Sequence, residues 1–256
     1  MHLLADSHCH IDAAEFDPDR DAVLRRARDA GVDTLIAPAV DAAGWDRLEQ
    51  LCAQHAGLHP AFGLHPVATS QHRPEHLVAL HQRLRQGGIA VGECGLDFWD
   101  GMADAALQHH YFEAQLVLAR EFQLPVIVHA RRALDTVIAC LRRAGPLRGV
   151  VHSFSGSWQQ AEQLWRLGFL LGIGGPVTYP RAQRLRRTVT VMPIEHLLLE
   201  TDSPDQPDAG QRGQRNEPAR LATVLDCVAE LRGTDRASLA AATRANCHRL
   251  FNLPSP

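Results

Sequence analysis

The sequence predicts an α/β protein, a single (β/α)8 TIM barrel, from two regularities in its 256 residues. Short apolar runs recur about every 28 residues, which is close to the length of one strand-plus-helix unit. Stretches in which apolar residues follow helical spacing lie between these runs. Because no linker-like stretch divides the chain, we expect one domain over residues 1–256 with its functional site at the C-terminal ends of the strands.

Eight apolar runs are the predicted strands. Most are continuously apolar, as is typical of parallel strands that are covered on both faces. They are residues 3–5, 34–37, 60–63, 89–92, 126–128, 149–151, 169–173 and 197–199. An open doubly wound sheet is the alternative, but eight evenly spaced units without an evident second domain favour the barrel.

Helical patterns fill the intervals between the predicted strands. The longest, residues 104–122, places Leu107, Tyr111 and Gln115 four residues apart on one face. The predicted helices are residues 17–30, 44–55, 74–86, 104–122, 132–144, 157–167, 180–189, 217–232 and 235–249. The stretch 203–218, rich in Gly, Gln, Asp and Pro, follows the eighth run and is predicted to be a long loop and a candidate active-site flap.

The basic residues are unusual because all 26 are arginine and none is lysine. The absence of lysine excludes Schiff-base catalysis, a P-loop lysine and a carbamylated lysine that bridges two metals. The 15 histidines favour a metal site or acid–base chemistry without proving either.

Charge, cysteine content and the N-terminus set the expected surroundings. The net charge of −3 argues against a protein that coats nucleic acid, although it allows an enzyme that grips a few phosphates. The six cysteines form no Cys-x-x-Cys pair and indicate a reducing compartment. No signal peptide begins the chain, and no stretch approaches the ~20 apolar residues of a membrane span. We therefore expect a cytoplasmic protein without a membrane partner.

Ionisable residues follow most of the predicted strands. In an extended chain Asp6, His8 and His10 would share one face after the first strand. The other strand-end residues are Glu93, His129, His152 and Asp202. Leaving Asp6 aside, the barrel would gather the imidazoles of His8, His10, His129 and His152 and the carboxylates of Glu93 and Asp202 at its mouth. This set is enough for two divalent metals bridged by a carboxylate and a water. Burying six such polar groups costs several kcal/mol unless something pairs them, which favours a metal pair over six independent polar residues.

Seven segments, together with the end of the chain, resemble in order the motifs of the TatD-type metal-dependent deoxyribonucleases. They are Asp6-Ser7-His8-Cys9-His10, Gly63-Leu64-His65-Pro66, Gly92-Glu93-Cys94-Gly95-Leu96-Asp97, Pro125-Val126-Ile127-Val128-His129, His152-Ser153-Phe154-Ser155-Gly156, Glu200-Thr201-Asp202-Ser203-Pro204, Arg215-Asn216-Glu217-Pro218 and the ending Asn246-Cys247-His248-Arg249-Leu250-Phe251. Each motif alone is weak, whereas their succession along the whole chain is specific.

The resemblance implies a metallo-dependent hydrolase barrel of the amidohydrolase-like group. It implies one metal on His8, His10 and Asp202, a second on His129 and His152, and Glu93 between them. It also implies a 3′-5′ exonuclease that binds the end of single-stranded DNA. The family is usually described as magnesium-dependent, whereas ligand softness in an imidazole-rich site favours zinc or manganese.

Further residues receive predicted roles at this site. We expect Asp202 and Glu93 to be catalytic, with Asp202 accepting a proton from the attacking water. His65, Arg131, Arg215 and Asn216 are candidate substrate contacts, the arginines because a guanidinium grips phosphate bidentately. The arginines of the seventh predicted helix, Arg181, Arg184, Arg186 and Arg187, are interpreted as a solvated helix face rather than a DNA-steering surface.

Two other functions remain open at this point. The same metals could hydrolyse a carboxylic ester, a lactone, an amide or an aminoacyl-tRNA ester, since six metal ligands do not choose phosphorus over carbon. A metal-holding scaffold that binds nucleic acid or another partner without turnover is the third interpretation. Its weakness is that the predicted two-metal set has lost no ligand. We expect a monomer.

Overall fold

The computed structural model describes residues 2–254, in which eight parallel strands alternate with helices. The strands are β1 (Leu4–Asp6), β2 (Val32–Pro38), β3 (Leu58–Ala61), β4 (Val91–Asp97), β5 (Val126–Arg131), β6 (Gly149–Val151), β7 (Phe169–Ile173) and β8 (Leu197–Leu199). Every predicted strand is present. The largest difference is in β4, which runs on to Asp97 and therefore includes polar residues that the sequence placed after a strand.

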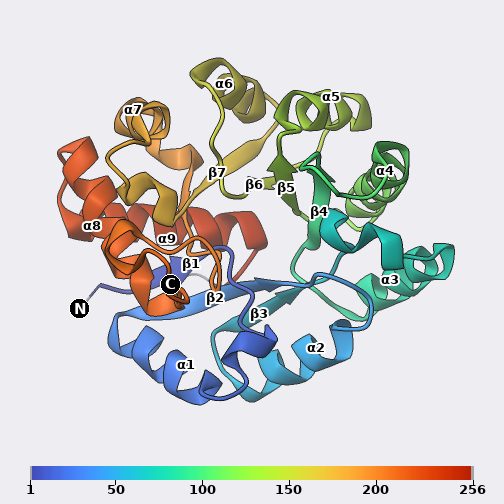
Figure 1. Ribbon diagram of the computed structural model, residues 1–256, viewed down its shortest axis with the longest axis horizontal. Coiled ribbons are helices and arrows are strands. Elements are labelled where there is room, and N and C mark those ends of the chain that lie inside the picture. The colour runs from blue at the N-terminus through green and yellow to red at the C-terminus, as the bar shows by residue number, and fades with distance from the viewer. Residues whose placement is uncertain (1, 255–256) are drawn as a thin grey trace.

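The strands form a ring with most helices outside it (Figure 1). Parallel ladders join β1-β2-β3 and β4-β5-β6-β7-β8 in chain order. Backbone hydrogen bonds cross both seams, from Gly92 N–H to Phe62 O (2.9 Å) and from Ser7 N–H to Leu199 O (3.0 Å). The predicted barrel is therefore the arrangement found, rather than an open doubly wound sheet.

Most helices follow the strands around the outside of the ring, whereas the last helix lies close to β1, towards the middle (Figure 1). The helices are α1 (Arg20–Asp29), α2 (Trp45–Gln54), α3 (Pro74–Gln86), α4 (Ala105–Glu121), α5 (Leu134–Ala144), α6 (Trp158–Arg166), α7 (Gln183–Val191), α8 (Leu221–Arg232) and α9 (Arg236–Phe251). Side-chain caps begin several of them, as when Asp104 accepts a hydrogen bond from the Ala106 amide. Within residues 2–254, no helix has the length and apolar character needed to cross a bilayer.

A separate apolar layer fills the interior of the ring. It takes one residue from, or beside, each strand, and the end of α9 packs against it through Cys247, Leu250 and Phe251. The strand residues of this layer are Ala5, Ile36, Ala61, Ala90, Ile127, Val150, Leu170 and Leu198. Because these apolar side chains occupy the interior, the polar residues that follow the strands are gathered at its C-terminal mouth.

A substitution at Gly149 would test how closely the strands of this ring are packed. A Cβ at this position would lie 2.2 Å from the Val126 carbonyl oxygen and 2.6 Å from the Phe169 ring, so Gly149→Ala would force β6 from its neighbours. We predict a loss of about 3 kcal/mol in the free energy of unfolding, measured by urea denaturation. The control Gly44→Ala, whose Cβ would meet no atom closer than 3.7 Å, should change that free energy by less than about 1 kcal/mol. Equal stability of the two variants would contradict this packing.

Candidate metal centre

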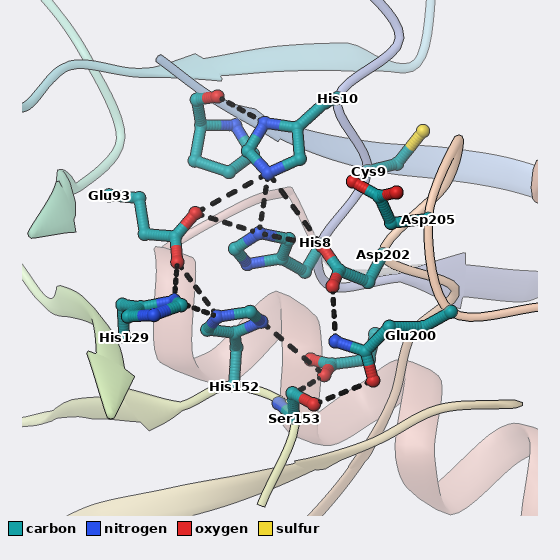
Figure 2. A network of polar contacts seen from close by, with 12 residues as sticks. His8, Cys9, His10, Glu93, His129, His152, Ser153, Glu200, Asp202 and Asp205 are labelled. Atoms are coloured by element: carbon teal, nitrogen blue, oxygen red, sulfur yellow. Dashed lines mark hydrogen bonds and ion pairs between the residues drawn. The ribbon is translucent and has the colours of Figure 1, made fainter. Parts of the chain in front are cut away.

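The strand ends bring six predicted ligands into one cluster (Figure 2). His8 and His10 follow β1, His152 follows β6 and Asp202 follows β8, whereas Glu93 and His129 lie within β4 and β5. Glu93 is 1% exposed and stands among the imidazoles. Its two carboxylate oxygens face different groups of histidines, which divides the cluster into two halves.

The first half consists of four potential ligand atoms, one of which is Glu93 Oε2. His8 Nε2 and His10 Nε2 lie 3.2 Å apart, and they lie 3.1 and 3.4 Å from Glu93 Oε2. Asp202 Oδ1 lies 3.5 and 3.7 Å from the same two nitrogens. Ligand distances of about 2.0–2.2 Å in a tetrahedral zinc site place neighbouring ligand atoms about 3.3–3.6 Å apart. These four atoms could therefore hold one cation with little rearrangement.

The second half surrounds the other oxygen, Glu93 Oε1. His152 Nε2 lies 2.7 Å and His129 Nδ1 lies 3.0 Å from this oxygen, and the two nitrogens are 3.1 Å apart. These three atoms could hold a second cation, with Glu93 between the two positions. The grouping fits the assignment that the resemblance implied.

Hydrogen bonds on the far side of two rings fix which nitrogen faces the cluster. His10 Nδ1 lies 3.2 Å from the Pro38 carbonyl oxygen, and His129 Nε2 lies 3.1 Å from Asp97 Oδ2. Both partners accept, so these nitrogens carry a proton, and in the neutral ring that a metal requires the lone pair of the other nitrogen points towards Glu93. Such outer partners are usual for histidines that ligate metals.

Electrostatics also favour a cation at this place. Burial opposes charge on the Glu93 carboxylate, but the imidazoles of His152, His65 and His8 outweigh burial and hold its pKa well below the usual range. Burial likewise opposes charge on His10 and His152, but interactions with Glu93 raise their pKa values to about 9 and about 10. Glu93 Oε2 is buried and has no hydrogen-bond donor. The residues present therefore fit a metal, because a bound cation would replace the imidazole protons as the positive charge beside this carboxylate.

His65 reaches the cluster with a different proton arrangement. Its Nδ1 accepts a hydrogen bond from the Val67 amide (3.0 Å), so neutral His65 carries its proton on Nε2. That Nε2 lies 3.1 Å from Glu93 Oε1. In this tautomer His65 is a hydrogen-bond donor towards the site rather than a third nitrogen ligand.

Asp6 does not point into the cluster, contrary to the prediction that it shares a face with His8 and His10. The strand β1 ends at Asp6, so the alternation expected of an extended chain does not continue. The Asp6 carboxylate accepts hydrogen bonds from Thr201 N (2.9 Å) and Thr201 Oγ1 (2.6 Å). It therefore joins the end of β1 to the segment after β8, and burial raises its pKa to about 7.

Arg131 lies at the mouth of the site, whereas Arg215 and Asn216 hold the loop after β8. Arg131 is half exposed and lines a cleft together with His129, His152 and Asp202. Arg215 pairs with Asp19 at 2.8 and 2.9 Å, beside α1. Asn216 donates hydrogen bonds to the carbonyl oxygens of Thr201 and Asp205. Arg215 and Asn216 thus anchor the loop through these contacts, and substrate contact by either stays a prediction.

Sequence reasoning missed two residues that orient ligands. Asp97 is buried at the end of β4 and bonds to His129, and Gln206 donates to Asp202 Oδ2 while its carbonyl oxygen accepts from Ser153 Oγ. Asp97 could have been found, because it lies in the same strand-end motif as Glu93. Gln206 carried no signal, since it lies in an irregular loop of polar residues.

Known proteins resemble this chain in sequence and in structure. Residues 5–252 match the family of TatD-related DNases. The chain is 41% identical over 253 residues to YjjV of Escherichia coli K12, an uncharacterized metal-dependent hydrolase, across 97% of this chain and 98% of YjjV. The 3′-5′ ssDNA/RNA exonuclease TatD of Erwinia tasmaniensis is 36% identical over 254 residues, which cover 95% of this chain and 98% of TatD. The crystal structure of E. coli YjjV has a TM-score of 0.93 to this chain, at 40% identity and over 98% of each chain.

The barrel, the cluster at its mouth and these relatives together define a metal-dependent hydrolase. Within that class the chain belongs to the TatD family, since the family match runs through nearly all of the sequence.

Asp97 provides a test of the ligand orientation. We predict that Asp97→Asn lowers zinc affinity about 10- to 100-fold, because an amide can donate to His129 Nε2 and so favour the wrong tautomer. Competition with a zinc-binding dye measures this affinity. The control Asp226→Asn removes an exposed carboxylate that pairs with Arg236 far from the site, and it should leave zinc affinity unchanged. Equal affinities for the two variants would show that Asp97 does not orient a ligand.

Proposed function

We propose that the chain is a deoxyribonuclease that removes nucleotides from the 3′ end of single-stranded DNA, with two divalent cations held by the six clustered residues. The proposal rests on how the candidate metal ligands are divided between the two oxygens of Glu93. The imidazole nitrogens of His8 and His10 face Oε2, whereas those of His129 and His152 face Oε1. The name of the Erwinia tasmaniensis relative supports the choice of substrate. The arginines at the mouth support a phosphate substrate, because guanidinium groups match phosphate geometry.

His8, His10, Glu93 and Asp202 would hold one cation, and His129, His152 and Glu93 the other. When bound, the pair would lower the pKa of a water and polarise a phosphoryl oxygen. The carboxylate of Asp202, whose Oδ1 faces His8 and His10, would accept the proton of that water. Gln206 donates to Oδ2 and so holds the carboxylate in this orientation.

Two residues beside the proposed metal positions are suited to orient the phosphate. His65 can donate from Nε2, and Arg131 can donate from a guanidinium on the cleft wall. Both residues line one pocket beside His10 and Asp202, where an anionic substrate would meet their N–H groups. They would hold the scissile phosphate against the attacking water and reduce the entropy lost in reaching the transition state.

The types of candidate ligand also indicate which metal the site would bind. Four imidazoles favour zinc or another transition metal in the purified protein, whereas magnesium prefers shells of oxygen ligands. We expect activity to be supported by added manganese or magnesium as well. Elemental analysis of protein purified without added metal tests this expectation. Stoichiometric magnesium as the sole metal would contradict the argument from ligand type.

Asp202→Asn tests the proton acceptor. The amide keeps an oxygen for the cation but cannot accept a proton, so we predict a fall in kcat of about 10²- to 10⁴-fold with metal still bound. The measurements are kcat on end-labelled single-stranded DNA and the metal content of the same sample. The control Asp226→Asn should keep the wild-type kcat. Near-normal turnover by Asp202→Asn would remove this residue from the proton transfer.

A panel of substrates tests the reaction itself. We predict that the wild-type protein shortens 5′-labelled single-stranded DNA from its 3′ end, and that a chelator abolishes the reaction because the cluster then lacks its cations. An aryl ester and a lactone, assayed beside the DNA with and without chelator, should be hydrolysed far more slowly. Turnover of either compound while DNA stays intact would assign the site to carbon esters, and inactivity on all three with metal retained would indicate a binding scaffold.

A further inference from the structure

Two arginines, Arg131 and Arg132, stack on the ring of Trp99 at the mouth of the barrel, and these three side chains are called the arginine clamp. The Trp99 ring has the guanidinium carbon of Arg131 at 3.9 Å and that of Arg132 at 4.0 Å from its centre. Both arginine side chains are half exposed, and Trp99 is 42% exposed, which is unusual for so large an apolar side chain. Stacking on the ring restricts side chains that would otherwise sample many rotamers in water.

The arginine clamp is connected to the predicted metal ligands through the buried carboxylate of Asp97. The backbone N–H of Trp99 donates to Asp97 Oδ1 (2.9 Å), and Asp97 Oδ2 faces His129 Nε2 (3.1 Å). Arg131 NH1 lies 4.0 Å from the same Oδ2. The position of the clamped arginines is therefore fixed relative to His129 and to the proposed reaction centre.

Two adjoining clefts lead away from the cluster past Arg132. The inner cleft has a volume of 610 Å³ and is lined by His129, His152 and Asp202. The outer cleft has a volume of 370 Å³ and lies between the segments after β5 and β6. Five residues line both, Arg132 and Ser153 among them. The outer cleft therefore lies directly beside the inner cleft that holds the predicted metal ligands.

The outer cleft carries a second guanidinium, from Arg184 of α7. Arg184 NH2 donates to the Ser155 carbonyl oxygen (2.8 Å), which holds the side chain over the cleft that it lines. Two carboxylates lie near these guanidinium groups. Asp135 accepts a hydrogen bond from Gln160 Nε2, and Asp100 forms an ion pair with Arg132 at 3.3 Å. The Asp100–Arg132 pair is exposed, and such a pair stabilises little enough for a phosphate to replace it.

We propose that Arg132 and Arg184 bind the phosphates next along the strand from the one that is hydrolysed, and that Trp99 is a positioning residue that holds Arg132 ready for this contact. The proposal rests on the function proposed above and names its substrate as an oligonucleotide rather than a small phosphodiester. It also gives Arg184 a role that the sequence did not favour, because the folding of the chain places this member of the arginine run over the cleft.

Binding of non-cleavable DNA tests the proposal on the metal-loaded protein. The probes are 5′-fluorescein oligothymidylates of two and six nucleotides with phosphorothioate linkages, and fluorescence anisotropy gives Kd. The wild type should bind the longer probe at least tenfold more tightly. Arg132→Ala and Arg184→Ala should each raise Kd for that probe about tenfold, with a much smaller effect on the shorter one. The control Arg187→Ala, on the same helix but outside both clefts, should bind both probes as the wild type does.

Salt dependence separates direct contact from positioning. Loss of one phosphate contact should reduce the slope of log Kd against log salt by about 0.7 in Arg132→Ala and Arg184→Ala. Trp99→Leu should raise Kd three- to tenfold with the slope retained, since no charge is removed, and Trp99→Phe should restore part of the affinity. Equal affinity for both probes, or unchanged Kd in both arginine variants, would overturn the proposal. Cleavage of ordinary DNA by the wild type tests the proposed function separately.

Discussion

The burial of one carboxylate, that of Glu93, is the constraint on which the arrangement of the site depends. A carboxylate that is 1% exposed is unfavourable unless positive charge or hydrogen-bond donors surround it. The cluster surrounds it with imidazoles from the ends of several strands, divided between its two oxygens. Cations bound among these groups would neutralise the carboxylate and offset the free energy of burying its charge. The same cations would form the catalytic centre.

The rest of the barrel keeps those imidazoles in place. The apolar layer inside the ring, against which the end of α9 packs, leaves the C-terminal mouth as the place where polar groups gather. Asp6 joins the end of β1 to the segment after β8 through Thr201, next to His8 and Asp202. Asp97 then links His129 to the backbone of Trp99, so the predicted metal ligands and the arginine clamp share one support.

Most of the fold, and the gathering of the six polar residues at the mouth, could be predicted from the sequence, because both depend on periodic patterns. Apolar runs separated by helical spacing specify parallel strands, and His129 or His152 directly after such a run must lie at the mouth. The orientation of Asp6 was predicted wrongly, since it assumed an extended chain beyond Asp6. Side-chain partners such as Gln206, and the clamp around Trp99, depend on the paths of loops, for which the sequence has no periodic signal.

The placement of two cations on either side of Glu93 is the central claim, and anomalous X-ray scattering tests it most directly. Crystals of the zinc-loaded protein, measured at the zinc absorption edge, should show two peaks about 3.5–4 Å apart, with one carboxylate oxygen of Glu93 bound to each. His8, His10 and Asp202 should surround one peak, and His129 and His152 the other. A single peak, or zinc bound away from Glu93, would contradict the account.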